Sequence, residues 1–299
     1  MTSCSSISVE VRRARPLLGT LVDIRAFAPD KDCAVQAVHD AFTAVEQVQA
    51  LMSFHDPSSD VGRLNRGTVG RSIRIHPWTY HVLRSAQALH TASHGLFDIS
   101  TAPALVRGGW LPSNAVPMPR AGGSTADIWF GSGHRVRFRR PLLIDLGGIA
   151  KGFAVDRAIA ALRRHGATAG SINAGGDLRV FGPTREPVHV RCPESPGRFH
   201  PLTHLYNTAF ATSASYFAAR PVSGYLCAPV IDPRNGMPSR QSRSVSVQAS
   251  TCLMADALCK VVWLARSGEA TALLQRYRAK AWVVPAQPAM PVYHSHDAA

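Results

Sequence analysis

Two stretches in the first third of the chain carry hydrophobic residues at helical spacing. After Asp32 the apolar positions are 35, 38, 42, 45, 48 and 52, which predicts an amphipathic helix ending in the SFHDPSSD turn. A second helix is expected from Pro77, because proline is favoured in a first helical turn, and it should stop near Gly95. Before both, residues 17–26 alternate well enough to predict an opening strand.

The middle of the chain changes pattern several times. Residues 107–133 are rich in Gly, Pro and Ser, which indicates a long connection with little regular structure. HRVRFR (134–139) and LLIDL (142–146) are expected to pair as strands, and a helix should run from the glycines at 147–148 to Gly166. Strands are expected at 170–173, 178–181 and 188–192, and a loop at 193–201.

The C-terminal third alternates between strand and helix patterns. SRSVSVQAS (242–250) has the period of two of a strand with one wet face, and a strongly apolar helix follows over 253–262. A helix at 270–277 and a strand at 280–284 complete the pattern. Since no regular strand–helix alternation runs through the chain, we predict an α+β fold with antiparallel-rich sheets and packed helices. Residues 16–285 should form a single domain, flanked by an N-terminal extension (1–15) and a flexible tail (286–299).

Composition excludes several classes of protein. The chain has 299 residues, 45% hydrophobic and 17% charged, as expected for an ordinary globular protein. No apolar run approaches the roughly 20 residues of a transmembrane helix, and the N-terminus lacks the apolar region of a signal peptide, so we expect a cytoplasmic location. Six cysteines without a CxxC pair and 13 histidines without HExxH argue against a disulfide scaffold or zinc site.

The net charge of +14 comes almost entirely from arginine. Such a surface can attract nucleic acid, an anionic membrane or a phosphorylated small molecule. The arginines are dispersed and no nucleic-acid-binding motif accompanies them, so nucleic acid is not expected as the main partner. Attraction of a dianionic cofactor is the simpler use of this charge.

The densest chemical signal is IDLGGIAKGFAVD (144–156). A buried strand is expected to end at Asp145, a glycine turn follows, and Lys151 lies where a helix begins. Glycines let backbone approach a ligand closely, and helix N-terminal N–H groups favour phosphate oxygens. The spacing matches neither GxxxxGK[ST] nor GxGxxG, so an ordinary turn with a surface lysine stays open beside a phosphate site. A second glycine turn, NAGGD (173–177), strengthens the ligand-binding interpretation.

Several motifs, in this order, resemble those of the ApbE-type FAD:protein FMN transferases. They are PLLGT (16–20), MSFHDPSSDVGRLN (52–65), FDIS (97–100), DLGGIAKGFAVD (145–156), NAGGDL (173–178), ATSASY (211–216), IDPRNGMP (231–238) and MADAL (254–258). The resemblance covers about residues 16–284 and implies an ApbE-like (T-fold-like) mixed fold that binds FAD and Mg²⁺. It also implies transfer of FMN through a phosphodiester bond to a Thr or Ser of a client flavoprotein, with release of AMP.

The same resemblance implies a set of FAD contacts. They are Leu18, Phe54, Ser100, Thr101, Ala102, Asp145, Lys151 and Val230. Phe54 replaces the family's usual tyrosine, which keeps a stacking face and loses a hydroxyl. Structural roles are the alternative, namely core packing for Leu18 and Phe54 and turn formation for Ser100 and Thr101. Asp145, at the end of an apolar strand, is the hardest to explain without a ligand.

For the metal, the resemblance implies Mg²⁺ held by the carbonyl of Gly148 and by Asp256. Asp256 or an adjacent acidic group is the expected catalytic base. Oxygen ligands suit this hard cation. Lys260 occupies the position of the family's third ligand, a threonine, and lies one helical turn from Asp256. It forms either a simple Asp–Lys pair or an ammonium that contacts phosphate. Mg²⁺ is still expected to bind.

A second departure concerns the transfer step. Pro229 precedes the VIDP segment where family members often have histidine, and proline cannot accept a proton. Another group must then deprotonate the acceptor hydroxyl. Two alternatives therefore stay open: hydrolysis of FAD to FMN and AMP, and binding of FAD without catalysis.

Overall fold

The computed structural model describes residues 8–113, 118–119, 122–183, 185–193, 195, 197–215, 218–266, 268–285 and 292–294. In this part of the chain the largest element is an eight-stranded sheet of order β1-β2-β6-β7-β10-β14-β15-β16, in which each neighbouring pair is antiparallel. Its strands are β1 Val9–Leu17, β2 Thr20–Ala28, β6 Ala169–Ala174, β7 Asp177–Phe181, β10 Ala209–Ala214, β14 Arg243–Ala249, β15 Lys280–Pro285 and β16 Val292–His294.

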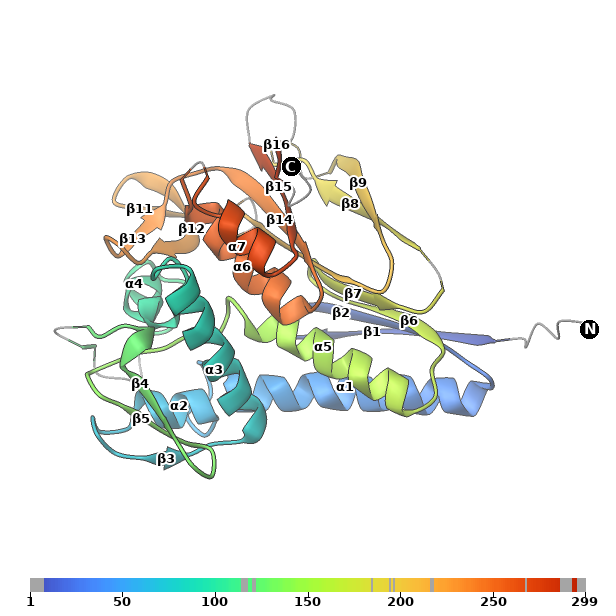
Figure 1. The fold of residues 1–299 in the computed structure, drawn as a ribbon, viewed down its shortest axis with the longest axis horizontal. Coiled ribbons are helices and arrows are strands. Elements are labelled where there is room, and N and C mark those ends of the chain that lie inside the picture. The colour runs from blue at the N-terminus through green and yellow to red at the C-terminus, as the bar shows by residue number, and fades with distance from the viewer. Residues whose placement is uncertain are drawn as a thin grey trace, which may run out of the picture.

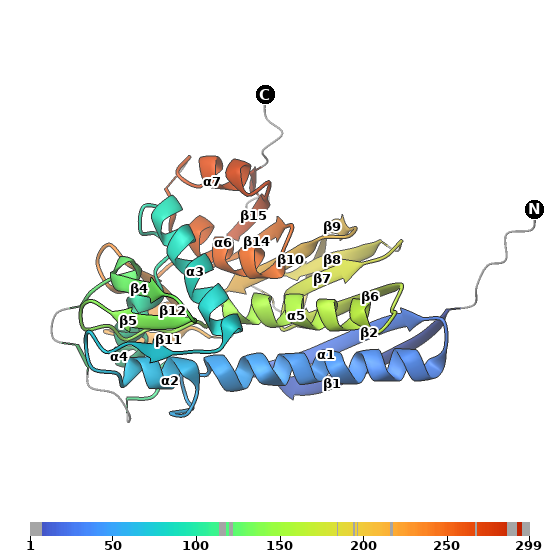
Figure 2. The same cartoon turned by 60° about the horizontal axis from the view of Figure 1, so that its bottom comes forward.

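Three long helices cover one face of this sheet. They are α1 Lys31–Met52, α5 Ala150–Arg164 and α6 Cys252–Leu264. Helix α1 packs on β1 and β2, α5 on β6 and β7, and α6 on β10 and β14, and α5 lies between the other two (Figure 2). The apolar positions that predicted α1, such as Val38, Phe42 and Val45, are buried. The main core therefore lies between the sheet and these helices.

A hairpin covers part of the opposite face. It consists of β8 Glu186–Arg191 and β9 Phe199–Leu205. Val188, Val190 and Leu205 from this hairpin form a small cluster with Phe210 and Trp282 of the sheet. The hairpin belongs to the cavity described below, because both of its strands contribute to the wall.

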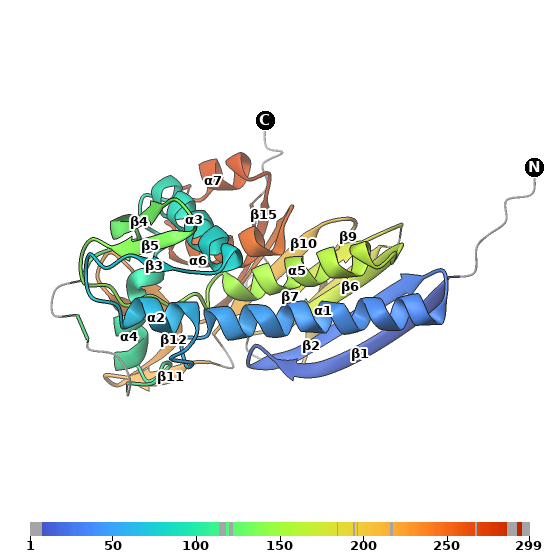
Figure 3. The ribbon, with the colours of Figure 1, turned by 90° about the horizontal axis from the view of Figure 1, so that it is seen from below.

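The remaining elements gather beside one end of the sheet (Figures 1 and 3). They are α2 Asp60–Asn65, β3 Ile73–Arg74, α3 Pro77–Ala92, η1 Ile99–Thr101, α4 Ala102–Arg107, η2 Thr125–Asp127, β4 Ile128–Gly131, β5 Arg135–Phe138, β11 Arg220–Val222, β12 Tyr225–Asp232, β13 Met237–Ser239 and α7 Thr271–Arg276. Of these, β3, β5 and β4 form one small sheet, and β11, β12 and β13 form another. Among the described residues, no helix is both long and apolar enough to cross a membrane.

Helices α5 and α6 stabilise each other's first turns. Asp156 of α5 accepts hydrogen bonds from the backbone N–H groups of Cys252 and Leu253, both at 2.9 Å. Asp256 of α6 accepts one from the N–H of Gly152 at 3.2 Å. A Cβ at position 152 would lie 2.2 Å from the carbonyl oxygen of Cys252, so only glycine permits this approach. Each aspartate thus accepts hydrogen bonds from backbone N–H groups that have no partner within the first turn of the other helix.

The predicted α+β class is confirmed, and so are most helices. The strand expected at 17–26 exists from residue 20 onward as part of β2, with its start wrongly placed, and a second predicted strand is absent. Residues 17–26 do not form one strand, because Leu18 and Gly19 adopt φ angles of +56° and +70° and turn the chain between β1 and β2. Two positive φ angles are typical of a tight hairpin turn. Strand β1 begins at Val9 and so includes part of the segment expected as an extension.

The second wrong prediction is LLIDL. Residues 142–146 form no strand, and the backbone of Ile144 bonds instead to the side chain of Asn65, which accepts at 2.8 Å and donates at 2.9 Å. The N–H of Asp145 donates to the carbonyl of Ile99 at 2.9 Å. In addition, β4 lies in the connection predicted to be irregular, and β9 lies partly in the predicted 193–201 loop. Of the expected tail at 286–299, only β16 is among the described residues.

Candidate functional site

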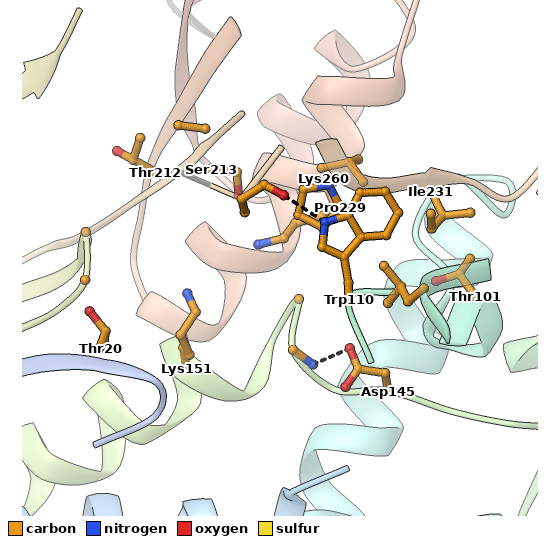
Figure 4. Close-up of a pocket in the computed structure, with 18 of the residues that line it drawn as sticks. Thr20, Thr101, Trp110, Asp145, Lys151, Thr212, Ser213, Pro229, Ile231 and Lys260 are labelled. Atoms are coloured by element: carbon orange, nitrogen blue, oxygen red, sulfur yellow. Dashed lines mark hydrogen bonds between the residues drawn. The ribbon is translucent and has the colours of Figure 1, made fainter. Parts of the chain in front are cut away.

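A cavity of about 930 Å³ lies where the end of the sheet meets the elements beside it (Figure 4). Pockets for small ligands and cofactors span about 300–1,000 Å³, so this one is large enough for an extended cofactor. The lining residues used below are Thr20, Thr101, Trp110, Asp145, Gly147, Gly148, Lys151, Gly175, Gly176, His189, Val230 and Lys260.

The glycine turn before α5 forms part of the wall. Gly147 donates its N–H to a carboxylate oxygen of Asp145 at 3.0 Å, and a Cβ at position 147 would lie 2.8 Å from that oxygen. At Gly148 a Cβ would lie 3.4 Å from Cε of Lys260. Both glycines therefore keep backbone, rather than side chain, against the cavity. The first turn of a long helix next to them favours an anion.

The second glycine turn reaches the same cavity. Gly175 and Gly176, between β6 and β7, have φ angles of +62° and +102°. A Cβ on Gly175 would lie only 2.4 Å from Oγ1 of Thr20, so this turn packs directly against the start of β2. Both turns that the sequence singled out thus line one cavity, although they lie in different parts of the fold.

Two lysines and two aspartates form a charged cluster at the cavity wall. Nζ of Lys151 lies 2.8 Å from Oδ2 of Asp177, and Lys260 forms an ion pair with Asp256. Lys260 also donates to the backbone carbonyl of Asp256 at 3.1 Å. Each carboxylate side chain is only 1% exposed, whereas both lysines line the cavity. Figure 4 shows Lys151 on α5 and Lys260 on α6 among the residues that line the cavity.

The electrostatics keep this cluster charged at neutral pH. Burial raises the pKa of Asp177 to about 6, and repulsion from Asp256 adds to the rise. Burial alone would also raise the pKa of Asp256, but Lys260 and Lys151 outweigh it and lower that pKa. Burial opposes the charge of Lys151, yet Asp177 and Asp256 raise its pKa. Two positive and two negative charges therefore balance, with the positive ones facing the ligand space.

Asp145, an acidic residue that the sequence analysis expected to contact FAD, lines the cavity. Burial raises the pKa of its carboxyl group, while the N–H of Gly147 and the positive charge of Lys260 work in the opposite direction. A carboxylate with a raised pKa is a better proton acceptor than an ordinary surface aspartate. Its position next to the glycine turn places this proton acceptor at the expected phosphate site.

The expected FAD contacts fall into two groups. Thr101, Asp145, Lys151 and Val230 line the cavity. Four others are not among the described lining residues, namely Leu18, Phe54, Ser100 and Ala102.

The structure gives these four residues other surroundings. The N–H of Leu18 donates to the side chain of Gln49 at 2.6 Å. Phe54 makes an edge contact with His55, with ring centroids 6.3 Å apart. Ser100 donates to Asp98 at 2.6 Å inside a turn, and Ala102 is fully buried. Turn formation by Ser100 agrees with the structural alternative considered from the sequence.

Sequence reasoning missed several cavity residues. The indole of Trp110 lies against Gly108, where a Cβ would be 2.0 Å from Cζ3 of the ring, and its Nε1–H donates to the carbonyl of Ala218 at 2.7 Å. A tryptophan within a connection rich in Gly, Pro and Ser could have indicated a cavity residue, because such a segment has no hydrophobic core of its own in which to bury the ring. His189 on β8 also lines the cavity, whereas sequence alone gave no reason to place it there.

The carboxylate expected to hold a metal already accepts hydrogen bonds from protein donors. One carboxylate oxygen of Asp256 accepts from Lys260, and the other accepts from the N–H of Gly152 at 3.2 Å. Asp256 is not a described lining residue, because Lys260 lies between it and the cavity. The part of the chain that the structure describes contains no group of three or more His, Cys, Asp or Glu side chains arranged to hold a metal.

Known proteins are similar to this chain in sequence and in fold. A sequence model of the ApbE family matches residues 18–283. The FAD:protein FMN transferase of Vibrio cholerae is 24% identical over 274 residues, covering 86% of this chain and 82% of that protein. The enzyme of the same name from Treponema pallidum is 25% identical over 301 residues, covering 90% and 82%.

Solved structures agree with the sequence comparison. The apo flavinyl transferase ApbE of Pseudomonas stutzeri has a TM-score of 0.80 at 20% identity, covering 95% of this chain and 93% of that one. The ApbE protein of Thermotoga maritima also has a TM-score of 0.80, at 24% identity, covering 93% and 94%. The match to the family extends over nearly the whole chain, including both glycine turns and the α6 motif. The chain therefore belongs to the ApbE family.

Proposed function

We propose that this chain is an FAD:protein FMN transferase, which moves FMN from FAD to a serine or threonine hydroxyl of a client flavoprotein and releases AMP. The observation that carries the proposal is the convergence of both glycine turns, the start of α5 and two lysine ammonium groups on one cavity. Backbone N–H groups and positive charges together are what a diphosphate requires. The related enzymes from Vibrio cholerae and Treponema pallidum bear this name.

In this proposal the diphosphate of FAD lies against the turn at Gly147 and Gly148. Lys151 and Lys260 supply positive charge from the adjacent wall, and Trp110 offers an aromatic surface for a ring of the cofactor. Stacking on an aromatic side chain is worth on the order of 1 kcal/mol beyond the buried area. The isoalloxazine and adenine rings would extend from the turn into the rest of the cavity.

The transfer step forms one bond to phosphorus and breaks another. The acceptor hydroxyl oxygen attacks the phosphorus of the FMN half, and the bond from that phosphorus to the bridging oxygen breaks. AMP leaves with the electron pair, and the hydroxyl proton passes to a carboxylate. Asp145 is the best candidate for this proton, because it lines the cavity and burial raises its pKa. Asp256, the base expected from the sequence, lies behind Lys260 and acts here as a positioning residue.

The Mg²⁺ that the family resemblance implies does not fit the residues of this chain at Asp256. Mg²⁺ requires oxygen ligands in a nearly octahedral arrangement, and a lysine ammonium has no lone pair to donate. Lys260 already holds the carboxylate of Asp256, and it also packs against Gly148, the other expected ligand. The transfer step above accordingly contains no metal-bound group.

The direct test is to incubate the full chain with FAD and a client domain that carries an Asp-Gly-x-Thr site. In-gel flavin fluorescence should reveal a labelled client, and chromatography should show one AMP for each flavin attached. Free FMN formed without a client would show hydrolysis instead of transfer. FAD that stays intact beside an unlabelled client would show binding alone, and either outcome overturns the proposal.

A further inference from the structure

The feature that carries a further inference is the position of Lys260. Its ammonium group donates to a carboxylate oxygen of Asp256 and, at 3.1 Å, to the backbone carbonyl of the same residue. Its aliphatic stem packs on Gly148. The side chain is 22% exposed and lines the cavity, whereas Asp256 is 1% exposed. The lysine therefore occupies the space between a buried carboxylate and the ligand.

This arrangement is the one that a bound cation would have. The N–H of Gly152 donates to one carboxylate oxygen of Asp256 and so fixes the orientation of the carboxylate. The other oxygen is then free to bind a cation on the side of the cavity, as it binds the ammonium of Lys260. Removing that positive charge would leave a buried carboxylate without its ion-pair partner, which strongly destabilises a protein. Asp256 consequently needs a permanent cationic partner, and in this chain a covalently attached one is present.

Lys151 repeats the arrangement on the neighbouring helix. Its ammonium group lies 2.8 Å from the buried carboxylate of Asp177 and also lines the cavity. The pairs interact with each other, since Lys151 helps to lower the pKa of Asp256 and Asp256 helps to raise that of Asp177. Two ammonium groups thus face the cavity from neighbouring helices, Lys151 in the first turn of α5 and Lys260 in the second half of α6. A diphosphate carries two negative charges, which this pair matches.

We propose that the ammonium of Lys260 takes the place of a divalent cation, so that this chain binds the diphosphate of its dinucleotide without a metal. The inference rests on the proposed function, since it concerns the same cavity. It makes Lys260 a binding residue for the diphosphate and Asp256 the residue that positions it. The substitution of one residue, Lys260→Thr, should then create a metal requirement.

The test measures FAD binding to the purified full chain by quenching of flavin fluorescence, in EDTA and in millimolar Mg²⁺. The unmodified chain should bind FAD equally in both, within about twofold, since an ammonium needs no metal. Lys260→Thr should lose about tenfold or more in affinity in EDTA, the loss of one charge-assisted contact, and should recover most of it with Mg²⁺. Titration calorimetry with Mg²⁺ alone should show binding to this variant and none to the unmodified chain.

Two matched variants separate charge from shape. Lys260→Arg keeps the positive charge and should bind FAD with no metal requirement, whereas Lys260→Met removes the charge without adding an oxygen and should not be rescued by Mg²⁺. If Lys260→Thr does not fold, as judged by its thermal unfolding, the unmodified chain and Lys260→Arg carry the test.

The outcomes distinguish this inference from the function on which it rests. If the unmodified chain binds FAD only with Mg²⁺, or if Lys260→Thr binds as well in EDTA as the unmodified chain, the inference is overturned and the transferase proposal stands. If the unmodified chain binds no FAD under either condition, both fail.

Discussion

At the scale of single residues, the cavity is shaped by side chains whose partners lie far away in the sequence. Lys151 is paired with Asp177, and Trp110 is fixed by the carbonyl of Ala218. Gly108 allows the indole ring to lie flat against the backbone. Each of these contacts orients a group toward the ligand space, so substitutions here should change ligand binding more than folding.

The first prediction concerns the aromatic surface. Trp110→Ala should weaken FAD binding about tenfold, because a stacked ring contributes on the order of 1 kcal/mol in addition to its buried area. Trp110→Phe should retain most of the affinity. Trp129→Ala is the matched control, since Trp129 packs against Arg137 in the small sheet and is not a described lining residue. Equal losses at the two tryptophans would rule out a specific stacking role.

The second prediction is a pH dependence that originates at Asp177. Its pKa of about 6 is above the ordinary value of 3.8, so its carboxyl group becomes neutral as the pH falls through about 6. The cavity then gains one net positive charge, and FAD affinity should rise several-fold between about pH 8 and 5.5, in keeping with one added charge contact. Fluorescence titration at each pH measures this.

Two variants assign that pH profile. Asp177→Asn should flatten it, and Asp145→Asn should not, although the pKa of Asp145 is also raised by burial. The contribution of Asp177 to stability depends on pH in the opposite direction to that of a salt-bridged surface carboxylate, whose contribution is lost as the pH falls. Because folding raises the pKa of Asp177, its contribution is fully present below about pH 4 and is lost as the pH rises to about 6. A profile that stays unchanged in Asp177→Asn contradicts the assignment.

At the scale of elements, the cavity depends on how α5 and α6 are joined at their first turns. Asp156 accepts from two N–H groups of α6 and pairs with Arg179, while Asp256 serves the start of α5. Gly152 permits the close approach. This mutual capping sets the relative position of the helices that carry Lys151 and Lys260, and therefore of both ammonium groups.

The third prediction tests this joint. Asp156→Ala should lower the free energy of unfolding by about 2–4 kcal/mol, because two helix-start donors and one half-buried guanidinium lose their partner. Urea unfolding measures the change. Asp30→Ala is the control, since Asp30 is an exposed N-cap that accepts from Cys33 at 2.8 Å, and its loss should lower stability clearly less than the loss of Asp156. A loss at Asp156 no larger than at Asp30 would argue against the joint.

At the scale of the whole molecule, the net charge of +14 surrounds a cavity whose own cluster is balanced. The positive electrostatic field of the whole protein therefore acts on an anion at long range, and the cluster of two lysines and two aspartates acts on it at contact. Long-range attraction of an anion raises its association rate and is screened by salt. It does not discriminate among anions, so recognition of the dinucleotide falls to the cavity.

The fourth prediction follows from that separation. The association rate constant of FAD should fall about tenfold from low to high salt, because the steering field is screened. Riboflavin, which lacks the diphosphate, should show almost no change and serves as the control. Stopped-flow fluorescence measures both rates. A decrease of the same size for both ligands would remove steering as the cause.

Local patterns predicted the helices well. The apolar stripes of α1, α3, α5 and α6 are local properties of the chain, and a helix of that length buries its stripe wherever it packs. Strand predictions were weaker, because the partner of an extended segment is not local. Residues 142–146 are apolar and extended, but Asn65 and Ile99 provide their backbone partners, so no strand forms.

The sequence by itself determined the α+β class, the long helices, the two glycine turns, and the choice of Asp145 and Lys151 as candidate site residues, because all of these depend on spacing and residue type along a continuous segment. Only the tertiary structure decided that both turns line one cavity, that Trp110 and His189 line it too, and that Lys260 lies over Asp256. The physical reason is that burial and charge pairing are set by which distant segments meet, and packing of the sheet against its helices sets that.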